Sequence, residues 1–352
     1  MPAQPVKWVK DQKENFRSWF FNQLHDTMGD RQQLERQWED NIINWRARLI
    51  GDGVGDVPFI GAPYSKDTEI LTRLGWKAIE EVELGELVLT RDDDTGRTEW
   101  APVQAKPSFW FEELLHFKSR TVDLMVSPGH TMVLQKQDGT LVRKPAFEIW
   151  DKNGYYIPLM GEYAGVDAEE LWGLDAGDVA EFVGWYLAEG STSGSGTISI
   201  AQKKPHGRNA IQSLLERLGF GYKVYDNAFS VHVSSIPKEL RLWLCDGKVC
   251  HEKAVPKFFY GASPRLIKRL LSSMIAGDGT VHWGSNSKQP QINYYTTSEE
   301  LAGDVQALAQ LAGMRASVTW RDRIDEGGKI DGRQINAKRR SYRVGILNRI
   351  RS

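Results

Sequence analysis

The 352-residue sequence predicts an α+β protein of three parts, and two features carry that prediction. First, an apolar helical run that ends in an acid and a glycine occurs twice, at 182–190 and 271–279, and similar strand and helix patterns follow each copy. Second, short strand patterns separated by turn residues fill positions 63–165. We therefore expect a short helical N-terminal segment, an all-β domain, and a domain that uses one αββαββ-like unit twice with pseudo-two-fold symmetry.

The first part, residues 1–62, is polar and helical in pattern, with scattered aromatic anchors. Positions 32–49 have the apolar spacing of a surface helix, which the glycine-rich stretch 51–56 ends. No catalytic motif is evident here. The composition and the closing word VPFIGA at 57–62 resemble the N-terminus of a phage head or portal protein. The resemblance rests on short words and implies that this segment belongs to a host protein.

The second part, residues 63–165, reads as a compact all-β domain. The expected strands are 69–72, 75–79, 86–90, 114–117, 121–126 and 132–134. Ser127 and His130 are the residues in this part that could carry chemistry. Taken alone, a histidine in such a setting is most simply a packed, hydrogen-bonded core residue.

The third part begins with the first apolar run. Its apolar residues lie all round the helix, so we expect a buried helix. Gly190 is expected to end that helix in the left-handed conformation common at helix C-termini. Glu189 is unusual there, because a carboxylate in the last turn of a buried helix faces the negative end of the helix dipole and loses solvation. Taken alone, the run is most simply a capped core helix.

The second run repeats this layout with Asp278 before Gly279. Each run has two small residues four positions apart on one face: Gly184 and Ala188 in the first, Ser273 and Gly277 in the second. Two such faces can pack closely. If the helices are parallel neighbours, Glu189 and Asp278 meet in one site, and two carboxylates at the end of a helix pair suit a hard cation.

Both runs precede similar patterns. After the first we expect a strand at 197–201, a helix at 209–218 and strands through Val224 and Val231. After the second we expect a strand at 292–296, a helix at 298–312 and strands at 316–320 and 342–347. The alternative is two unrelated capped helices, which would not explain the repeated order.

The paired runs and the units after them resemble the LAGLIDADG (dodecapeptide or DOD-type) homing endonucleases. The resemblance covers 166–352, with repeats at about 175–260 and 261–352. It implies that Glu189 and Asp278 are the catalytic residues, that both bind Mg²⁺, and that metal-activated water cuts one phosphodiester on each strand of double-stranded DNA. It also implies a monomer with pseudo-two-fold symmetry. The family more often has aspartate at both acid positions, so Glu189 raises a question about rate.

The same resemblance places two sheets in the DNA major groove, with mixed backbone and base contacts. The net charge of −1 hides a basic stretch, since 321–352 contains ten Lys or Arg against four Asp or Glu. Such a stretch suits a phosphate backbone, although it can equally be a solvated face. Our candidates for backbone contact are Gln202, Lys203, Lys204, Lys338, Arg339 and Arg340.

Two stretches of the β part, 67–79 and 126–134, resemble the N-terminal blocks of inteins, self-splicing elements with the Hint fold. The order fits, because many inteins carry a LAGLIDADG domain after these blocks. In that family a hydroxyl residue and a histidine three places on lie against the upstream splice junction. The resemblance therefore implies that Ser127 and His130 polarise the scissile peptide and protonate its nitrogen.

Two departures from the intein pattern put splicing in doubt. Family members begin with Cys or Ser four residues before the Asp-Thr pair, and here that count reaches Pro63, which has neither a nucleophile nor an N–H. A junction at Ala62 or Ser65, or a first attack from a downstream Cys or Ser, are the alternatives. The closing β blocks and the terminal His-Asn are also not seen. We expect a fragment, a truncated gene, or one half of a split intein completed by a separate C-terminal half.

The remaining features suggest a cytoplasmic protein of a phage or its bacterial host. Cys245 and Cys250 are too few for a disulfide framework, and with His251 they lack an evident fourth metal ligand. No signal peptide or membrane span is visible, so we expect no membrane partner. Three rivals to the endonuclease remain: a splicing element with an inactive nuclease, a non-cleaving DNA-binding regulator or RNA maturase, and a phage structural protein interrupted by this element.

Overall fold

The computed structural model describes residues 64–347, apart from 93–94, 107–112, 120–121, 159, 194–196, 247, 284–289, 323–326, 331–332 and 337, and it describes 327–336 by backbone alone. The chain divides into two units at Val57 and Pro58, and the described residues all belong to the second. The expected helical segment 1–62 and the expected junction residue Pro63 lie outside the described residues.

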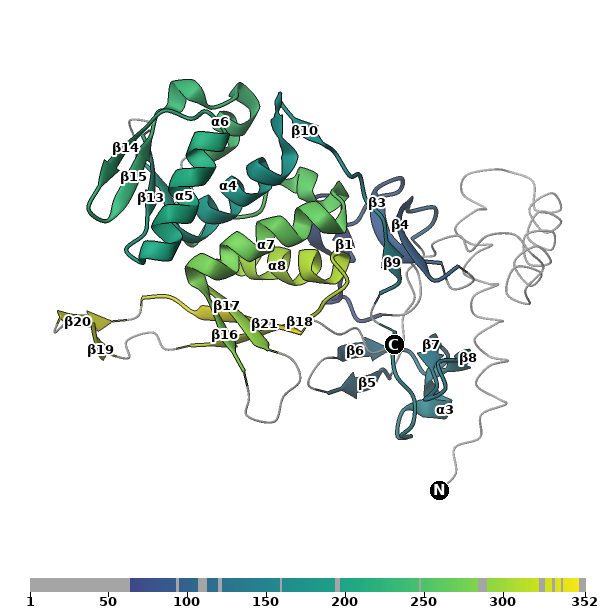
Figure 1. The fold of residues 1–352 in the computed structure, drawn as a ribbon. Helices are drawn as coiled ribbons and strands as arrows, with labels where there is room; N and C mark the ends of the chain where they lie inside the picture. Colours follow the sequence, from purple (N-terminus) through teal and green to yellow (C-terminus); the bar gives the residue numbers. More distant parts are fainter. Residues whose placement is uncertain are drawn as a thin grey trace, which may run out of the picture. The chain divides into compact units, whose positions relative to one another are not determined.

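A five-stranded sheet with the order β2-β1-β3-β4-β9 opens the described chain (Figure 1). Its strands are β1 (Glu69–Thr72), β2 (Gly75–Ala78), β3 (Leu87–Arg91), β4 (Arg97–Pro102) and β9 (Glu162–Tyr163). The first three match the expected strands to within a residue. Strand β4 was not predicted from the sequence. Thr98 is the only fully buried side chain of β4, so this strand lacks the apolar alternation by which strands are recognised.

Two separate hairpins and a short helix follow: β5 (Leu115–Lys118), β6 (Asp123–Val126), β7 (Thr131–Gln135), β8 (Leu141–Pro145) and α3 (Ala146–Ile149). Their buried side chains form a cluster of their own around Val126, Leu134 and Ala146. In the five-stranded sheet, by contrast, Leu71 and Tyr163 belong to the large core of the third part. Residues 63–165 therefore do not share one core.

Contacts between the five-stranded sheet and the third part explain that division. The Trp76 indole N–H donates to the Gly303 carbonyl at 3.0 Å. The Trp100 indole and the Tyr163 hydroxyl donate to the Tyr260 carbonyl at 3.2 and 2.9 Å. The hydrophobic core thus crosses the domain boundary expected at 165/166, and that boundary stays a prediction.

The first repeat follows a small hairpin of β10 (Glu170–Leu171) and β11 (Leu174–Asp175). It comprises α4 (Ala176–Glu189), β12 (Gly190–Thr192), β13 (Ile198–Ala201), α5 (Pro205–Arg217), β14 (Tyr222–Tyr225), β15 (Ala228–Val231), the 3₁₀ turn η1 (Val233–Ser235) and α6 (Lys238–Leu244). A second 3₁₀ turn, η2 (Lys257–Gly261), leads to the next repeat. The expected strand, helix and strand pair are present, whereas β12 and α6 are additions.

The second repeat comprises α7 (Pro264–Asp278), β16 (Gly279–His282), β17 (Gln291–Thr296), α8 (Glu299–Leu311), β18 (Arg315–Arg321) and β21 (Ser341–Leu347). A hairpin of β19 (Gly327–Ile330) and β20 (Arg333–Asn336) lies between the last two strands in sequence. The Ser298 hydroxyl accepts from the Leu301 N–H and so caps α8. The four expected elements are confirmed.

The two repeats have the same sheet topology. The strand orders are β12-β13-β15-β14 and β16-β17-β21-β18, and every pairing is antiparallel. In each sheet the glycine that follows the helix starts the first strand: Gly190 pairs with Ile200, and Gly279 pairs with Tyr294. This common register confirms the predicted internal repeat and makes each position of one sheet comparable with a position of the other.

The prediction that Gly190 ends the first helix in a left-handed conformation is wrong. Gly190 has φ −84° and ψ 155°, and Gly279 has φ −106° and ψ 170°, both extended. Each helix passes directly into a strand, so no reversing turn is needed. A Cβ at Gly190 would lie 2.5 Å from the Tyr186 carbonyl oxygen, and a Cβ at Gly279 equally close to that of Ile275. Glycine is required here for space.

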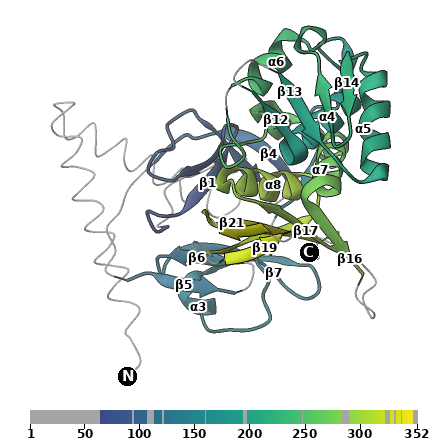
Figure 2. The same ribbon diagram turned by 90° about the vertical axis from the view of Figure 1, so that its left-hand side faces the viewer.

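Helices α4 and α7 pack against each other through their small residues, as predicted (Figure 2). A Cβ on Gly184 would overlap Ser273 Oγ and the Leu270 carbonyl, and a Cβ on Gly277 would lie 2.6 Å from the Ala188 Cβ. These contacts advance in the same direction along both helices, so the helices are parallel and end together. None of the helices in the described part of the chain is both long and apolar enough to cross a membrane.

Candidate metal and DNA-binding site

Two carboxylates meet where the parallel helices end. Glu189 is the last residue of α4 and Asp278 the last of α7. A Cβ on Gly277 would lie 3.1 Å from Glu189 Cγ, so the Glu189 side chain runs along the last turn of α7. The structure therefore brings together the two acids that the sequence singles out. In the described residues no group of three or more His, Cys, Asp or Glu is placed to share a metal, so this site offers two protein carboxylates.

The electrostatics of the pair are those of a partly desolvated anionic site. Burial at the foot of the helices, with the charge of Glu189 second, raises the pKa of Asp278 to about 6. Burial also raises the pKa of Glu189, while Lys204 and Lys253 lower it. Asp278 is exposed on one side and Glu189 is half-buried, so both can reach a ligand from solvent. A cation between them would relieve their repulsion.

A buried lysine that the sequence reading overlooks caps the first helix. Lys253 is 7% exposed, and its ammonium donates to the carbonyls of Tyr186, Leu187 and Gly190 at 3.0, 2.9 and 2.7 Å. It thus satisfies the last carbonyls of α4 and offsets the negative end of the helix dipole. Burial lowers the pKa of Lys253, and Asp278 raises it. The sequence does contain a sign of this burial, because Lys253 comes directly before the apolar residues 254–256.

Gln202 does not lie where the sequence reading expects it. It is 5% exposed, its amide nitrogen lies 3.4 Å from Glu189 Oε1, and its Oε1 accepts from the Lys204 N–H at 2.9 Å. Gln202 therefore lies beside the two acids, where its amide supports the Glu189 carboxylate, and its contact with the DNA backbone stays a prediction. The misplacement arises because Gln202 follows β13 directly and folds back over Gly207, where a Cβ would lie 2.8 Å from Gln202 Cδ.

Tyr294, which pairs with Gly279 in the sheet, is buried near the two acids. Its side chain is 1% exposed, and among the described residues its hydroxyl has no hydrogen-bond partner. Burial raises the pKa of this phenol, and the charges of Asp278 and Glu189 raise it further, so the hydroxyl stays protonated near two anions. The sequence gives no sign of this role, because Tyr294 reads as an inward strand residue.

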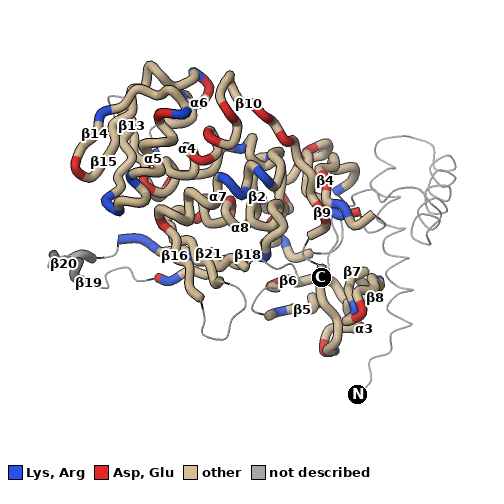
Figure 3. The backbone as a smooth tube through the Cα atoms, in the orientation of Figure 1, with Lys and Arg blue, Asp and Glu red and all other residues tan. Residues whose placement is uncertain are grey.

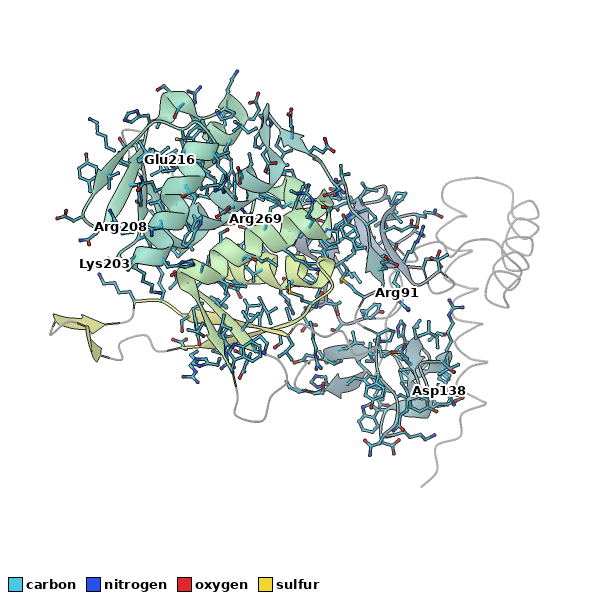
Figure 4. All side chains as sticks on the ribbon, viewed as in Figure 1. Arg91, Asp138, Lys203, Arg208, Glu216 and Arg269 are labelled. Atoms are coloured by element: carbon cyan, nitrogen blue, oxygen red, sulfur yellow. The ribbon has the colours of Figure 1, made fainter. Side chains whose placement is uncertain are left out.

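The other backbone-contact candidates lie on the surface near the sheets. Lys203 and Lys204 are exposed, and Figure 4 places Lys203 at the same end of α5 as Arg208, with Glu216 at the other end. Lys338 and Arg339 are exposed just before β21. Arg340 is engaged: its guanidinium stacks 4.2 Å from the Trp320 ring centroid and lies 3.6 Å from Asp322.

Charge is unevenly spread over the third part (Figure 3). Acidic and basic side chains pair away from the two acids: Arg217 binds Asp178 and Glu181 at 2.9 and 3.1 Å, and Arg269 binds Glu181 at 2.6 Å. A hollow of about 420 Å³ lined by Asp178, Arg265 and Arg269 lies within this network. These charges are already matched, so the hollow is a structural feature of the helix N-termini.

The residues expected to act in splicing, Ser127 and His130, lie between β6 and β7. The His130 ring lies edge-on to the Tyr64 ring, with centroids 4.8 Å apart, and the backbone N–H of His130 donates to the Ser127 backbone carbonyl at 3.0 Å. Tyr64 also pairs with Val126, so the residue after Pro63 is held beside the histidine. Burial lowers the pKa of His130 to about 4, which keeps the imidazole neutral at pH 7. Ser127 is 2% exposed.

Comparison with known families agrees with this geometry. A family model described as a LAGLIDADG-like domain matches residues 177–252 and 265–349. Each matched segment begins at the second residue of a motif helix, α4 or α7. The chain therefore contains a LAGLIDADG-like domain made of two repeats.

Three curated proteins are similar to parts of the chain. The ATP-dependent Clp protease proteolytic subunit of Chlamydomonas moewusii is 22% identical over 290 residues, covering 72% of this chain and 28% of that protein. The C-terminal section of the DNA-directed RNA polymerase beta subunit of Stigeoclonium helveticum is 23% identical, covering 80% and 31%. An uncharacterized protein of Methanocaldococcus jannaschii is 28% identical, covering 40% and 17%. The chain spans less than a third of each.

Among solved structures, the chain is similar to I-DmoI in complex with DNA and Mn, at 12% identity, covering 49% of this chain and 89% of that one with a TM-score of 0.30. Full-length DUF199/WhiA from Thermatoga maritima is similar at 9% identity, covering 48% and 50% with a TM-score of 0.31.

Proposed function

We propose that the chain is an intein-type element whose LAGLIDADG-like domain cuts double-stranded DNA at a specific site with Mg²⁺. The observation that carries the proposal is the meeting of Glu189 and Asp278 where two parallel helices end. Each acid lies directly before the first strand of its own sheet, so one cut in each DNA strand could be made between the two half-sites.

The donor set fits a hard divalent cation. Glu189 and Asp278 offer carboxylate oxygens, the ligands that Mg²⁺ prefers, and Mg²⁺ keeps waters and substrate phosphates for its other positions. Burial raises the pKa of both acids, and the charge of Glu189 raises that of Asp278 further, so a bound cation would favour the deprotonated forms. When bound, Mg²⁺ would supply Lewis acidity and a water of lowered pKa.

The chain's own residues have separable roles in this proposal. Glu189 and Asp278, when deprotonated, bind the cation. The Gln202 amide orients Glu189, and Lys253 fixes the end of α4 from which Glu189 projects. Lys203, Lys204, Lys338 and Arg339 contribute positive charge for the DNA backbone.

Cleavage of a defined plasmid tests the proposal. The plasmid carries the uninterrupted host coding sequence joined across the junction near Ala62, and the full chain is added with Mg²⁺. We expect double-strand cuts at that junction. Tight, salt-sensitive binding without cuts would instead support a non-cleaving DNA regulator or a nuclease-inactive splicing element. Absence of binding would exclude this DNA as the target.

Two observations support the intein part of the proposal. Tyr64, directly after Pro63, is held against His130, as a splice junction beside a block histidine would be. The similarity to the Stigeoclonium protein covers 80% of this chain. Residues 166–352 make up only about half of the chain, so the similarity extends into the β part. The relatives also have unrelated names and share less than a third of their length with this chain, as expected of an inserted element.

We also propose that the β part takes part in protein splicing together with a C-terminal intein half, in the cytoplasm of a bacterial cell or of the host cell of a phage. Co-expression with such a half tests this. A spliced product lost in His130→Ala and Ser127→Ala would support the proposal, and the same yield in both variants would contradict the assigned roles. The neutral imidazole indicates that His130 acts first as a hydrogen-bonding or basic group at pH 7.

A further inference from the structure

The common register lets the outward faces of the two sheets be compared residue by residue. The alternate positions point into the core, as with Ile200 and Phe229 in the first sheet and Tyr294 and Val344 in the second, so the remaining positions face away from the helices. Outward rows of the first sheet are Ser191-Ser199-Ser230-Lys223 and Ala201-Ala228-Tyr225. The matching rows of the second are Thr280-Asn293-Gly345-Ser317 and Tyr295-Arg343-Thr319.

The outward face of the first sheet is poor in groups that can distinguish bases. Strands β12, β13 and β15 offer serines and alanines at these positions. A methyl group makes no hydrogen bond, and a serine hydroxyl pairs with any base while reaching only a short distance. The long side chains, Lys223 and Tyr225, stand on the edge strand β14, where Lys223 suits a phosphate.

The second sheet carries long, directional side chains at the same positions. Where the first sheet has Ala201 and Ala228, it has Tyr295 and Arg343. The Arg343 Nε donates to the Thr319 hydroxyl at 3.2 Å, which fixes the guanidinium across the sheet. A further row pairs His282 with Gln291. Arginine reads guanine and glutamine reads adenine through paired hydrogen bonds in the major groove.

The centre of this face also contains polar atoms that call for a ligand. Asn293 is 6% exposed, and among the described residues neither its Oδ1 nor the Thr280 hydroxyl has a hydrogen-bond partner. Gly345 leaves the space beside them open, since a Cβ there would be 3.8 Å from Asn293 Oδ1. In the first sheet, Ser230 occupies the position that corresponds to Gly345. Buried polar groups without partners are costly, so a bound polar edge would stabilise them.

We propose that the two half-sites are read unequally: the second sheet selects bases through Arg343, Tyr295, Gln291 and Asn293, while the first sheet holds its half-site mainly through the phosphate backbone. This inference rests on the proposed DNA-binding function. It places the specificity-determining residues in β17 and β21, and it predicts a target with one defined half and one degenerate half.

Selection from a random duplex DNA library tests this, with the full chain in EDTA so that no strand is cut. The recovered sequences should show strong base preferences in one half and weak ones in the other. Arg343→Ala should reduce a preference of roughly tenfold or more at one position of the defined half to near unity. Ala228→Arg, the matched reverse change, should create a preference at the symmetry-related position of the degenerate half. Lys223→Ala should weaken binding without altering the selected sequence.

Equal information in both halves, or an unchanged pattern in Arg343→Ala, would overturn the inference and leave the proposed function standing. Loss of preference in the degenerate half on Arg343→Ala would overturn it as well. No retained DNA at any salt concentration would overturn the proposed function itself. If Ala228→Arg fails to fold, Arg343→Ala against Lys223→Ala decides the question.

Discussion

The two repeats of the LAGLIDADG-like domain share a backbone and differ in what they present. Both pass from an apolar helix directly into a strand, both place an acid at that junction, and both build a four-stranded sheet in the same register. They differ at the helix end and on the sheet. Lys253 caps α4, whereas no lysine of the described residues caps α7 in this way. The shared features are those that the proposed chemistry needs twice.

The largest expected effect tests whether the two acids are equivalent. Glu189→Gln and Asp278→Asn each keep the side-chain shape but remove a charge from the cation site. Each should lower the rate of DNA cleavage by at least about 100- to 1,000-fold, because charge stabilisation at the reacting phosphate is lost. Binding to the same duplex, measured by gel shift, should change little. Wild-type cleavage in either variant would show that the acids are not used as a pair.

A second prediction concerns the helix interface, where the repeats also differ. Gly184→Ala places a methyl against the Leu270 backbone and should destabilise the fold by about 3 kcal/mol. Gly277→Ala should cost less, about 1–2 kcal/mol, because only the Ala188 Cβ lies closer than 3.0 Å to the added methyl, whereas the methyl at Gly184 overlaps both Ser273 Oγ and the Leu270 carbonyl. Urea unfolding measures both, with the exposed Ser272→Ala as the control. Equal, small losses would contradict the close packing.

The cap on α4 gives a third test. Lys253→Met leaves the Tyr186, Leu187 and Gly190 carbonyls without their donor and should lower the free energy of unfolding by about 2 kcal/mol. The same change removes a cation that lowers the pKa of Asp278. The acid limb of the pH–rate profile should therefore move to higher pH. A stability loss with an unchanged limb would restrict Lys253 to a structural role.

The smallest expected effect is the change in folding stability when Asp278 loses its charge but keeps its shape. Its pKa of about 6 in the folded state lies above the ordinary value of 3.8, so this group favours folding below pH 3.8 and loses that contribution as the pH rises through 6. Without metal, Asp278→Asn should therefore stabilise the protein at pH 7.5 and leave it unchanged at pH 3.5. Solvent screens this exposed group, so the gain should stay below about 1 kcal/mol. Thermal unfolding at the two pH values measures it.

The repeat was predictable because its signals are local in the sequence: each copy has an apolar run, an acid and a closing glycine. Small residues four positions apart also predict that the two helices pack closely. The strand patterns around Ile70 and Val88 were equally clear. The conformation of Gly190 was not, because a helix C-cap and a helix-to-strand junction use the same residue for different reasons.

Long-range contacts account for the rest of what the sequence did not reveal. Lys253 lies far in sequence from the carbonyls it caps, and Gln202 turns inward only because Gly207 leaves space for it. The joining of the five-stranded sheet to the third part depends on Trp76 and Trp100, whose partners are backbone carbonyls with no sequence signature. Such contacts are fixed by tertiary packing, which local patterns do not encode.

The most direct test of the shared acidic site is a metal titration. Mn²⁺ binding to the full chain with a selected duplex can be followed by electron paramagnetic resonance at pH 7.5, which lies above the Asp278 pKa of about 6. A single site shared by Glu189 and Asp278 predicts that Glu189→Gln and Asp278→Asn each weaken binding by tenfold or more relative to the unchanged chain. Wild-type Mn²⁺ affinity in either variant would contradict a site built from both acids.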